Sequence, residues 1–333
     1  MTSPLILYDI LPNVDNPQRP YALLPNPWIT RLVLKAKNIP FTVKLITTDD
    51  LRAQGKDSFR QRLGDALGPN GRPLIPMIEH NNRLIGDNMT IADYLDVAFP
   101  DTPSAYLPEL SSSKAHQNDV AHRLAWNQAR QTRSTFMEGH AELIYHQATE
   151  LFDEHQRVWM RSDEKIGMPN AYNLFLSLDR AVLLANVRSH IAGTFSILLP
   201  PATLRVQRIS SGEDTTKLVN RPSNSPPLFL ASPSKPGLID FTVFSWFLFT
   251  YTADRPLNEA IWSESSDKAR KWLEQYEGGK FALKGDIAQP NHWPGDLPLQ
   301  GVSEWVDRMF SLYDNYTRKI INGEILEGEP EKL

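Results

Sequence analysis

Two polar positions in this sequence stand where a helix is expected to begin, and both could bind a small molecule. Asp87 and Asn88 directly precede apolar residues at helical spacing, and Asn88 has the character of an N-cap. The free N–H groups of a helix start suit a carboxylate, and the carboxylate of Asp87 suits an ammonium group. The structural alternative is that the Asp87-Asn88 pair only caps the helix.

Asn26 occupies the second position. Asn26-Pro27 predicts the start of an earlier helix, with asparagine as the N-cap and proline at the first helical position, where its missing N–H costs nothing. The alternative is again a cap without a chemical role. Tyr8, at the end of an expected strand, could also reach this site, but as a strand residue it is interpreted as a packing residue.

The stretch from Arg72 to Phe99 predicts the elements that position Asp87. A short apolar run, Leu74 to Ile78, is interrupted by Pro76, so this residue lies at an edge, a bulge or a strand start, and the Ile75-Pro76 bond is a candidate cis peptide. His80-Asn81-Asn82 then predicts a tight turn, and Arg83 to Ile85 predicts the returning strand before the helix.

The residues before this stretch predict an alternation of strands and helices. The order strand, helix, strand, helix, strand, strand, helix is that of a thioredoxin-like fold. Its first half consists of a strand at Leu5 to Tyr8, a long loop at Leu11 to Leu24, the helix from Asn26, a strand at Ile39 to Leu45, and a polar helix from Asp49 or Asp50 to Gly64.

The pattern in this stretch resembles the glutathione-binding half of glutathione transferases. The matching residues are Ile75-Pro76, Asp87-Asn88 and Ile91-Ala92-x-Tyr94-Leu95. The resemblance implies that a cis-proline turn offers the backbone of Ile75 to the cysteinyl part of glutathione. It also implies that Asp87 and Asn88 hold the γ-glutamyl end, with Asn88 where the family has serine.

The first helix is similar to that of the fungal etherase-like class of the same superfamily. The matching segment runs from Pro25 through Trp28 and Arg31 to Leu34. That class carries, just before the proline, a serine that stabilises the glutathione thiolate, and here this position is Leu24. The leucine side chain cannot donate a hydrogen bond, so we assign the catalytic role to Asn26, with Trp28 and Tyr21 as the next candidates, because free donors at a helix start lower a thiol pKa.

The rest of the chain predicts a helical domain. We expect a thioredoxin-like domain at 1–100, a proline-containing linker at 101–110, and an α-helical domain at 111–333. Helices are expected on both sides of a break near Gly139, and another at Asn170 to Ala192. Pro236 to Phe244 resembles the buried helix of the family, with Asp240 as the acid of a capping box.

One segment of this second domain does not fit the compact pattern. The stretch near 200–236 reads as an insertion, with a strand-like run at Thr203 to Ile209 and a hairpin around Gly212.

Composition excludes several classes of protein. The net charge of −4 offers no basic excess for nucleic acid, and the lack of cysteine excludes disulfides, thiolate zinc sites and a cysteine nucleophile.

The histidines and the apolar runs offer no further sites. His116 and His122, like His140 and His146, are six residues apart, which is about 240° on a helix, so neither pair shares a face and no metal site is expected. The sequence shows no signal peptide and no membrane-spanning stretch, which predicts a cytoplasmic protein.

The resemblance implies a glutathione transferase: an α/β thioredoxin-like domain plus an all-α domain, with glutathione as co-substrate and a homodimeric assembly. The thiolate would attack a small apolar electrophile held near the helices around Phe136 to Trp159. Conjugation, ether cleavage, and glutathione-assisted elimination or isomerisation, in detoxification or secondary metabolism, all remain open. The alternative is a non-catalytic protein on the same fold that binds glutathione or another ligand as a carrier or regulator, which Leu24 favours.

Overall fold

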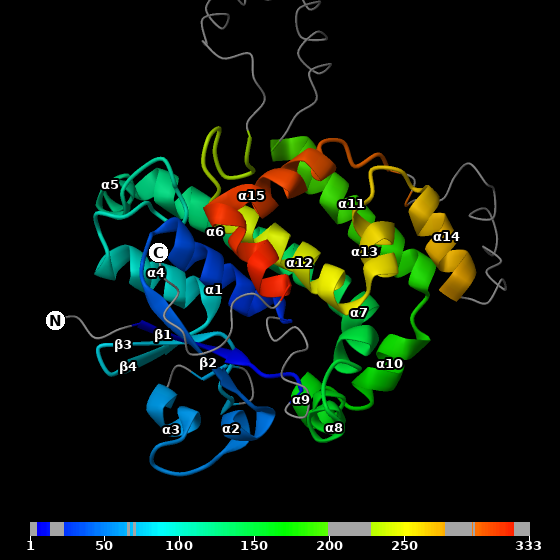
Figure 1. Cartoon of the computed structure of the whole chain (residues 1–333), viewed down its shortest axis with the longest axis horizontal. Helices are drawn as coiled ribbons and strands as arrows, with labels where there is room; N and C mark the ends of the chain where they lie inside the picture. The colour runs from blue at the N-terminus through cyan, green and yellow to red at the C-terminus, as the bar shows by residue number, and fades with distance from the viewer. Residues whose placement is uncertain are drawn as a thin grey trace, which may run out of the picture.

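The computed structural model describes residues 5–13, 23–64, 67–68, 71–198, 228–276, 295 and 297–322. A four-stranded sheet with its helices is followed by an all-helical region (Figure 1), which confirms the predicted fold class. The elements are β1 (Leu5–Ile10), α1 (Pro25–Ala36), β2 (Phe41–Ile46), α2 (Thr48–Arg52), α3 (Phe59–Leu63), β3 (Met77–His80), β4 (Arg83–Gly86), α4 (Asn88–Ala98), α5 (Ser112–Gln117), α6 (Asp119–Met137), α7 (His140–Thr149), α8 (Glu154–Met160), α9 (Asp163–Ile166), α10 (Ala171–Ser177), α11 (Arg180–Leu198), α12 (Leu238–Ala253), α13 (Arg255–Trp262), α14 (Asp267–Tyr276) and α15 (Val302–Ile321).

The sheet has the strand order β2-β1-β3-β4. β1 runs parallel to β2, with Leu5 opposite Phe41, and antiparallel to β3, with Tyr8 opposite Met77. α1 and α4 lie on the side of the sheet that faces the helical region, and α2 and α3 lie on the other side (Figure 1). The central strand β1 is therefore covered on both faces, which explains its nearly continuous apolar sequence.

The start of α1 differs from the prediction. The N-cap is Leu24 and Pro25 is the first helical residue, so the expectation that Asn26 caps this helix is wrong. The physical reason is the first of the two prolines. A residue before proline is driven toward extended geometry, and Leu24, with φ −74° and ψ 144°, adopts it. Asn26 consequently lies inside the first turn.

Two helices that were predicted as continuous are broken. The polar helix expected up to Gly64 is two short helices, α2 and α3, separated by a turn in which Gly55 has φ 131°. The helix expected at Asn170 to Ala192 is α10 followed by α11, because the Asp179 carboxylate accepts from the N–H of Ala181 at 2.8 Å and starts a new helix. The predicted break near Gly139 is confirmed between α6 and α7.

The helical region is organised around α12. Every residue of this helix from Leu238 to Thr250 is buried, and the helix packs against α1, α6 and α13. Its start is the predicted capping box, in which Asp240 accepts from the N–H of Gly237 at 3.1 Å. The same carboxylate also accepts from the N–H groups of Leu230 and Ala231 and from the indole of Trp305.

Lys37, at the C-terminal end of α1, joins the sheet region to the segment that leads into the helices. Its buried ammonium lies 2.6 Å from Asp96 on α4 and donates to Thr102, to the carbonyl of Pro103 and to Ser112 on α5. Removing one partner of a buried ion pair leaves the other charge uncompensated.

We therefore expect Lys37→Met to lower the free energy of unfolding by about 3–5 kcal/mol, measured by urea denaturation. Lys268→Met is the matched control, because Lys268 pairs with Glu259 at an exposed site and should change stability by less than about 1 kcal/mol. Equal losses in the two variants would contradict this role for Lys37.

Some of the predicted features lie outside the described residues. They are most of the loop at Leu11 to Leu24, the strand at Thr203 to Ile209 and the hairpin around Gly212. Across the described part of the chain, no helix combines the length and the apolar character needed to cross a membrane.

Candidate functional site

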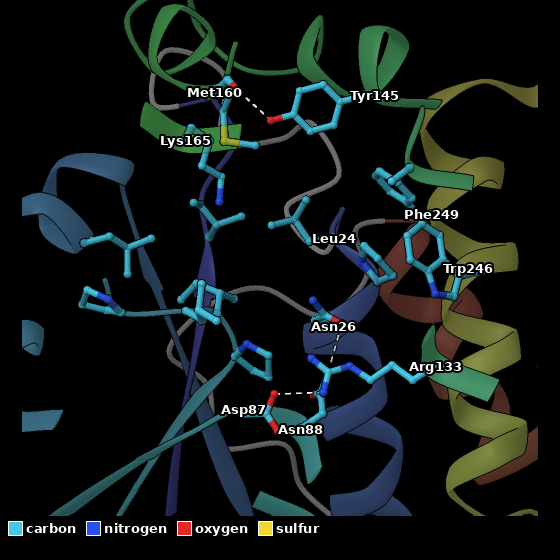
Figure 2. A pocket seen from close by; sticks show the side chains of 18 of the residues that line it. Leu24, Asn26, Asp87, Asn88, Arg133, Tyr145, Met160, Lys165, Trp246 and Phe249 are labelled. Carbon is cyan, nitrogen blue, oxygen red and sulfur yellow. Dashed lines mark hydrogen bonds and ion pairs between the residues drawn. The ribbon is translucent and has the colours of Figure 1, made fainter. Parts of the chain in front are cut away.

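A cavity of about 220 Å³ lies where the sheet region meets the helical region. All five predicted site residues line it, although 62 positions separate the first of them from the last. Asp87, Asn88 and Arg133 lie at one end, and Tyr145, Met160 and Lys165 lie at the other (Figure 2). The predicted residues in the lining are Asn26, Ile75, Pro76, Asp87 and Asn88.

Asp87 closes the first end of the cavity. It is the N-cap of α4, with φ 69°, and accepts from the N–H groups of Met89 at 2.9 Å and Thr90 at 3.4 Å. The expectation that Asn88 is the N-cap is therefore wrong: Asp and Asn cap equally well, and the side chain of Asn88 is engaged elsewhere. The second oxygen of Asp87 accepts from Arg133 on α6 at 2.9 Å.

Arg133 was not recognised from the sequence. It is 46 positions from Asp87 and belongs to no local motif, so only the packing of α6 brings the two side chains together. The ion pair is partly exposed, with relative side-chain exposures of 27% for Arg133 and 36% for Asp87, so both groups can still exchange partners with a ligand. An acid beside a guanidinium is suited to a ligand that carries both an ammonium and a carboxylate.

Asn88 connects α4 to α1 through two side-chain hydrogen bonds. The Thr30 hydroxyl donates to Oδ1 of Asn88 at 2.9 Å, and Nδ2 of Asn88 donates to Oδ1 of Asn26 at 3.1 Å. Because Oδ1 of Asn26 is thus an acceptor, its Nδ2 group is available as a donor at the cavity (Figure 2). The relay fixes the orientation of both amides.

The backbone at the start of α1 supplies few donors. Leu24 has no side chain that can cap the helix, and the prolines at positions 25 and 27 have no N–H. Of the first three helical residues, only Asn26 offers a backbone N–H. Any anion at this helix start is therefore expected to depend on Asn26.

The turn before β3 has the predicted geometry. The Ile75-Pro76 peptide bond is cis, and β3 begins immediately after it at Met77. Both residues of the turn line the cavity, so the backbone of Ile75 is close to any ligand that lies between Asn26 and Asp87.

The other end of the cavity combines apolar and polar groups. The helices that were expected to form it contribute Tyr145 and Trp159, and Tyr145 donates to the carbonyl of Met160 at 2.5 Å. Burial raises the pKa of the Tyr145 hydroxyl above its usual value, so it stays protonated. Sequence reasoning missed Trp246 and Phe249 of α12, because α12 was interpreted only as a structural helix.

A second recess adjoins the first. It shares Leu51, Pro73 and Trp159 with the main cavity. Arg72 lines this recess: its Nη2 donates to the carbonyl of Lys165 at 3.4 Å, and its Nη1 is buried without a hydrogen-bond partner among the described residues. An unsatisfied buried guanidinium nitrogen indicates a place for an acceptor group of a ligand or for water.

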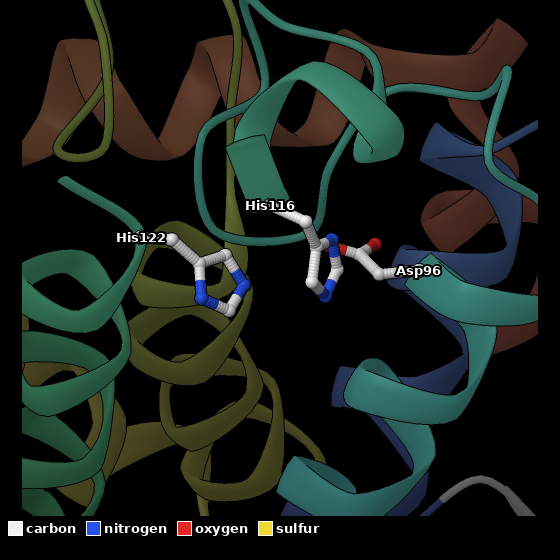
Figure 3. Close-up of side chains that lie close together, drawn as sticks. All are labelled: Asp96, His116 and His122. Carbon is white, nitrogen blue, oxygen red and sulfur yellow. The ribbon is translucent and has the colours of Figure 1, made fainter. Parts of the chain in front are cut away.

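A separate cluster contains Asp96, His116 and His122 (Figure 3). The prediction that these two histidines do not share a face assumed one continuous helix and is wrong: Asn118 ends α5 and begins α6, and the imidazole centroids are 4.5 Å apart. Asp96 already accepts from Lys37, and also from the Ser104 hydroxyl and the N–H of Ala105. Its oxygens serve as acceptors in the fold, which makes it a poor third ligand for a cation.

Two solved structures have a similar fold, and in each of them the match extends over nearly the whole chain. Glutathione transferase GSTFuA3 from Phanerochaete chrysosporium matches with a TM-score of 0.52 and 19% identity, over 84% of this chain and 99% of that chain. Glutathione S-transferase CsGST83044 of Ceriporiopsis subvermispora, in complex with glutathione, matches with a TM-score of 0.53 and 18% identity, over 84% of this chain and 100% of that chain. This chain has the glutathione transferase fold.

Two further comparisons found no relatives. No family model matches the sequence, and no curated protein matches it. The glutathione transferase fold is therefore established by the three-dimensional structure, and the fold alone does not determine the chemistry of the cavity, which depends on its own residues.

Proposed function

We propose that this protein binds glutathione in the cavity and that the glutathione thiolate attacks a small apolar electrophile. The observation that carries the proposal is the convergence of three elements on one cavity: the start of α1, the cis Ile75-Pro76 turn and the Asp87–Arg133 pair. In that order, the three elements suit the thiol, the cysteinyl backbone and the γ-glutamyl end of glutathione. The fold supports the proposal, because a structure of similar fold is a complex with glutathione.

Each end of glutathione has a complementary group. The γ-glutamyl ammonium is assigned to Asp87, and the γ-glutamyl carboxylate to Arg133 and the start of α4. The cysteinyl backbone is assigned to Ile75 beside the cis proline. The glycyl carboxylate is assigned to the second recess, where Nη1 of Arg72 has no partner within the described part of the chain.

The thiolate is assigned to Asn26. With Leu24 in the capping position and prolines on both sides, Asn26 is the group that can offer both a backbone and a side-chain N–H to the sulfur. Hydrogen bonds to a thiolate lower the pKa of the thiol, which raises the fraction of the reactive form at neutral pH. The apolar electrophile is assigned to the space beside Trp246 and Phe249.

Asn26→Ala is expected to lower kcat/KM for glutathione conjugation by about 10²–10³-fold, the usual cost of losing one donor to a developing anion. The change should leave the affinity for glutathione nearly unaffected. It should shift the pH–rate profile to higher pH, because the pKa of the bound thiol rises. Thr30→Val, which removes the end of the relay and keeps the amide of Asn26, is the comparison variant and should have a smaller effect. An unchanged pH profile in Asn26→Ala would sink this assignment.

The second candidate is a non-catalytic protein that binds glutathione or another ligand as a carrier or regulator. One observation favours it: Leu24 and the two prolines remove most of the donors that a thiolate would use at the start of α1. The two functions separate in one measurement. A transferase lowers the pKa of the bound thiol, whereas a carrier binds glutathione and its S-methyl derivative with the same dependence on pH.

The test of the proposed function is calorimetric titration with glutathione and with cysteinylglycine, which lacks the γ-glutamyl group. Binding of glutathione in the micromolar to millimolar range, with loss of binding for the dipeptide, supports the Asp87 end of the site. Turnover of a panel of aryl halides, aryl ethers and enones then identifies the reaction. Equal binding of tripeptide and dipeptide would contradict the proposed orientation.

We further propose that the protein is a cytoplasmic homodimer with a role in detoxification or secondary metabolism. The fold supports the dimer, and so do exposed apolar side chains on α4 (Val97) and on α6 (Val120 and Leu124). Isolated apolar residues are ordinary on a surface, so sedimentation of the purified protein is the measurement that decides.

A further inference from the structure

Lys165 is a polar group in the cavity that the proposed function does not use. It comes from α9, a single turn that begins at the Ser162 N-cap and ends at Gly167 in left-handed geometry. Its Nζ points into the cavity from the end opposite Asp87 (Figure 2) and lies 5.1 Å from the centre of the Trp159 ring. The side chain is thus held against an aromatic wall and directed at the ligand space.

Within the part of the chain that the structure describes, the charge of Lys165 is not neutralised by a counter-ion. Among the described residues no carboxylate lies within ion-pair distance of its Nζ, and the one acid in the cavity lining, Asp87, is paired with Arg133 at the far end. Burial and the neighbouring Arg72 guanidinium lower the pKa of Lys165 to about 8, so the ammonium form still predominates at neutral pH. A partly desolvated cation without a counter-ion is costly, and the binding of an anion would offset that cost.

Two parts of glutathione carry a carboxylate, and both already have an assignment. The γ-glutamyl carboxylate faces Arg133, and the glycyl carboxylate has the adjoining recess, which is lined by three arginines: Arg52, Arg60 and Arg72. Lys165 is therefore left for the other substrate. The wall between Lys165 and the start of α1 is apolar, with Leu24, Trp246 and Phe249.

We infer that Lys165 binds a carboxylate on the acceptor, so that this site prefers electrophiles with an apolar body and an acidic group remote from the reacting carbon. This inference rests on the proposed function. Lys165 is a specificity-determining residue: it contacts the acceptor and takes no part in bond making. A compact ammonium on a flexible stem suits a single carboxylate whose body is held by apolar contacts.

A matched pair of acceptors tests this: 4-chloro-3-nitrobenzoate and its methyl ester, which differ in charge and share the reacting ring. In both, the glutathione sulfur bonds to the carbon that carries chlorine, chloride leaves with the electron pair of the C–Cl bond, and the thiol proton goes to water. The wild-type protein should show a lower KM for the benzoate than for the ester.

Lys165→Met is expected to raise KM for the benzoate by about tenfold or more, the usual effect of losing a charge-assisted hydrogen bond. KM for the ester and KM for glutathione should change little, and Lys165→Arg should restore most of the preference. Lys271→Met, at an exposed position of α14, is the control for general effects of losing a lysine. Equal changes for benzoate and ester, or a selective rise in KM for glutathione, would overturn the inference.

A binding arm separates this inference from the proposed function. Quenching of tryptophan fluorescence by 4-chloro-3-nitrobenzoate, measured without glutathione, reports binding of the acceptor without a contribution from the tripeptide, because Trp159 and Trp246 line the cavity. If glutathione does not bind, the proposed function fails, while quenching that is lost in Lys165→Met and retained in Lys165→Arg still supports the anion site. Quenching that Lys165→Met leaves unchanged overturns it.

Discussion

Replacing Asp240 by alanine is expected to destabilise the protein by about 4 kcal/mol or more. Its carboxylate is fully buried and accepts four hydrogen bonds, from three backbone N–H groups and the indole of Trp305, at 2.7–3.1 Å. Each donor left without a partner in the interior costs about 1–3 kcal/mol. The side chain joins α12 to the segment before it and to α15, so its loss weakens the centre of the helical region.

Guanidinium or thermal unfolding measures the effect, and Asp254→Ala provides the comparison. Asp254 caps α13 and accepts from the N–H of Leu257 at 3.0 Å, so its loss should cost about 1 kcal/mol. Asp240→Asn keeps one carbonyl acceptor and should fall between the two. A loss in Asp240→Ala no greater than that in Asp254→Ala would show that water or a local shift satisfies the four donors.

Replacing Asp87 by alanine is expected to weaken glutathione binding by about ten- to hundredfold. The proposed function makes its carboxylate the partner of the γ-glutamyl ammonium, and hydrogen bonds between charged groups have this strength. Removing it also leaves Arg133 without the acid that lies 2.9 Å away. Isothermal titration of glutathione into wild-type and variant protein measures the change.

The main complication is that Asp87 also caps α4, so alanine should cost about 1 kcal/mol of stability as well. Asp87→Asn separates the two roles, because asparagine retains the cap and loses the charge. A second control uses glutathione without its amino group: if Asp87 binds the ammonium, wild-type and Asp87→Ala should bind this analogue with nearly equal affinity. A loss of the same size for both ligands would assign Asp87 to the helix alone.

Local chemistry determined much of what the sequence could predict. The cis bond at Ile75-Pro76, the hairpin that follows, the capping box at Asp240 and the break at Gly139 are all decided by sterics and hydrogen bonds within a few residues. Such signals can be read from neighbours in the chain. Even here, the predicted helix start at Asn26-Pro27 was wrong, because the helix begins at the earlier proline, Pro25.

Only the tertiary structure decided which distant residues meet. The approach of Arg133 to Asp87, the relay from Thr30 to Asn26, and the direction of Lys165 into the cavity depend on how helices pack, and no local spacing encodes that packing. His116 and His122 show the same limit, because the break at Asn118 removes the single-helix geometry on which their separation was predicted. The sequence by itself determined the fold class and the approximate position of the two helix starts, since these follow from short-range preferences, but it named the wrong capping residue at each. The charges that face the ligand come from α6 and α9, and long-range packing alone places them there.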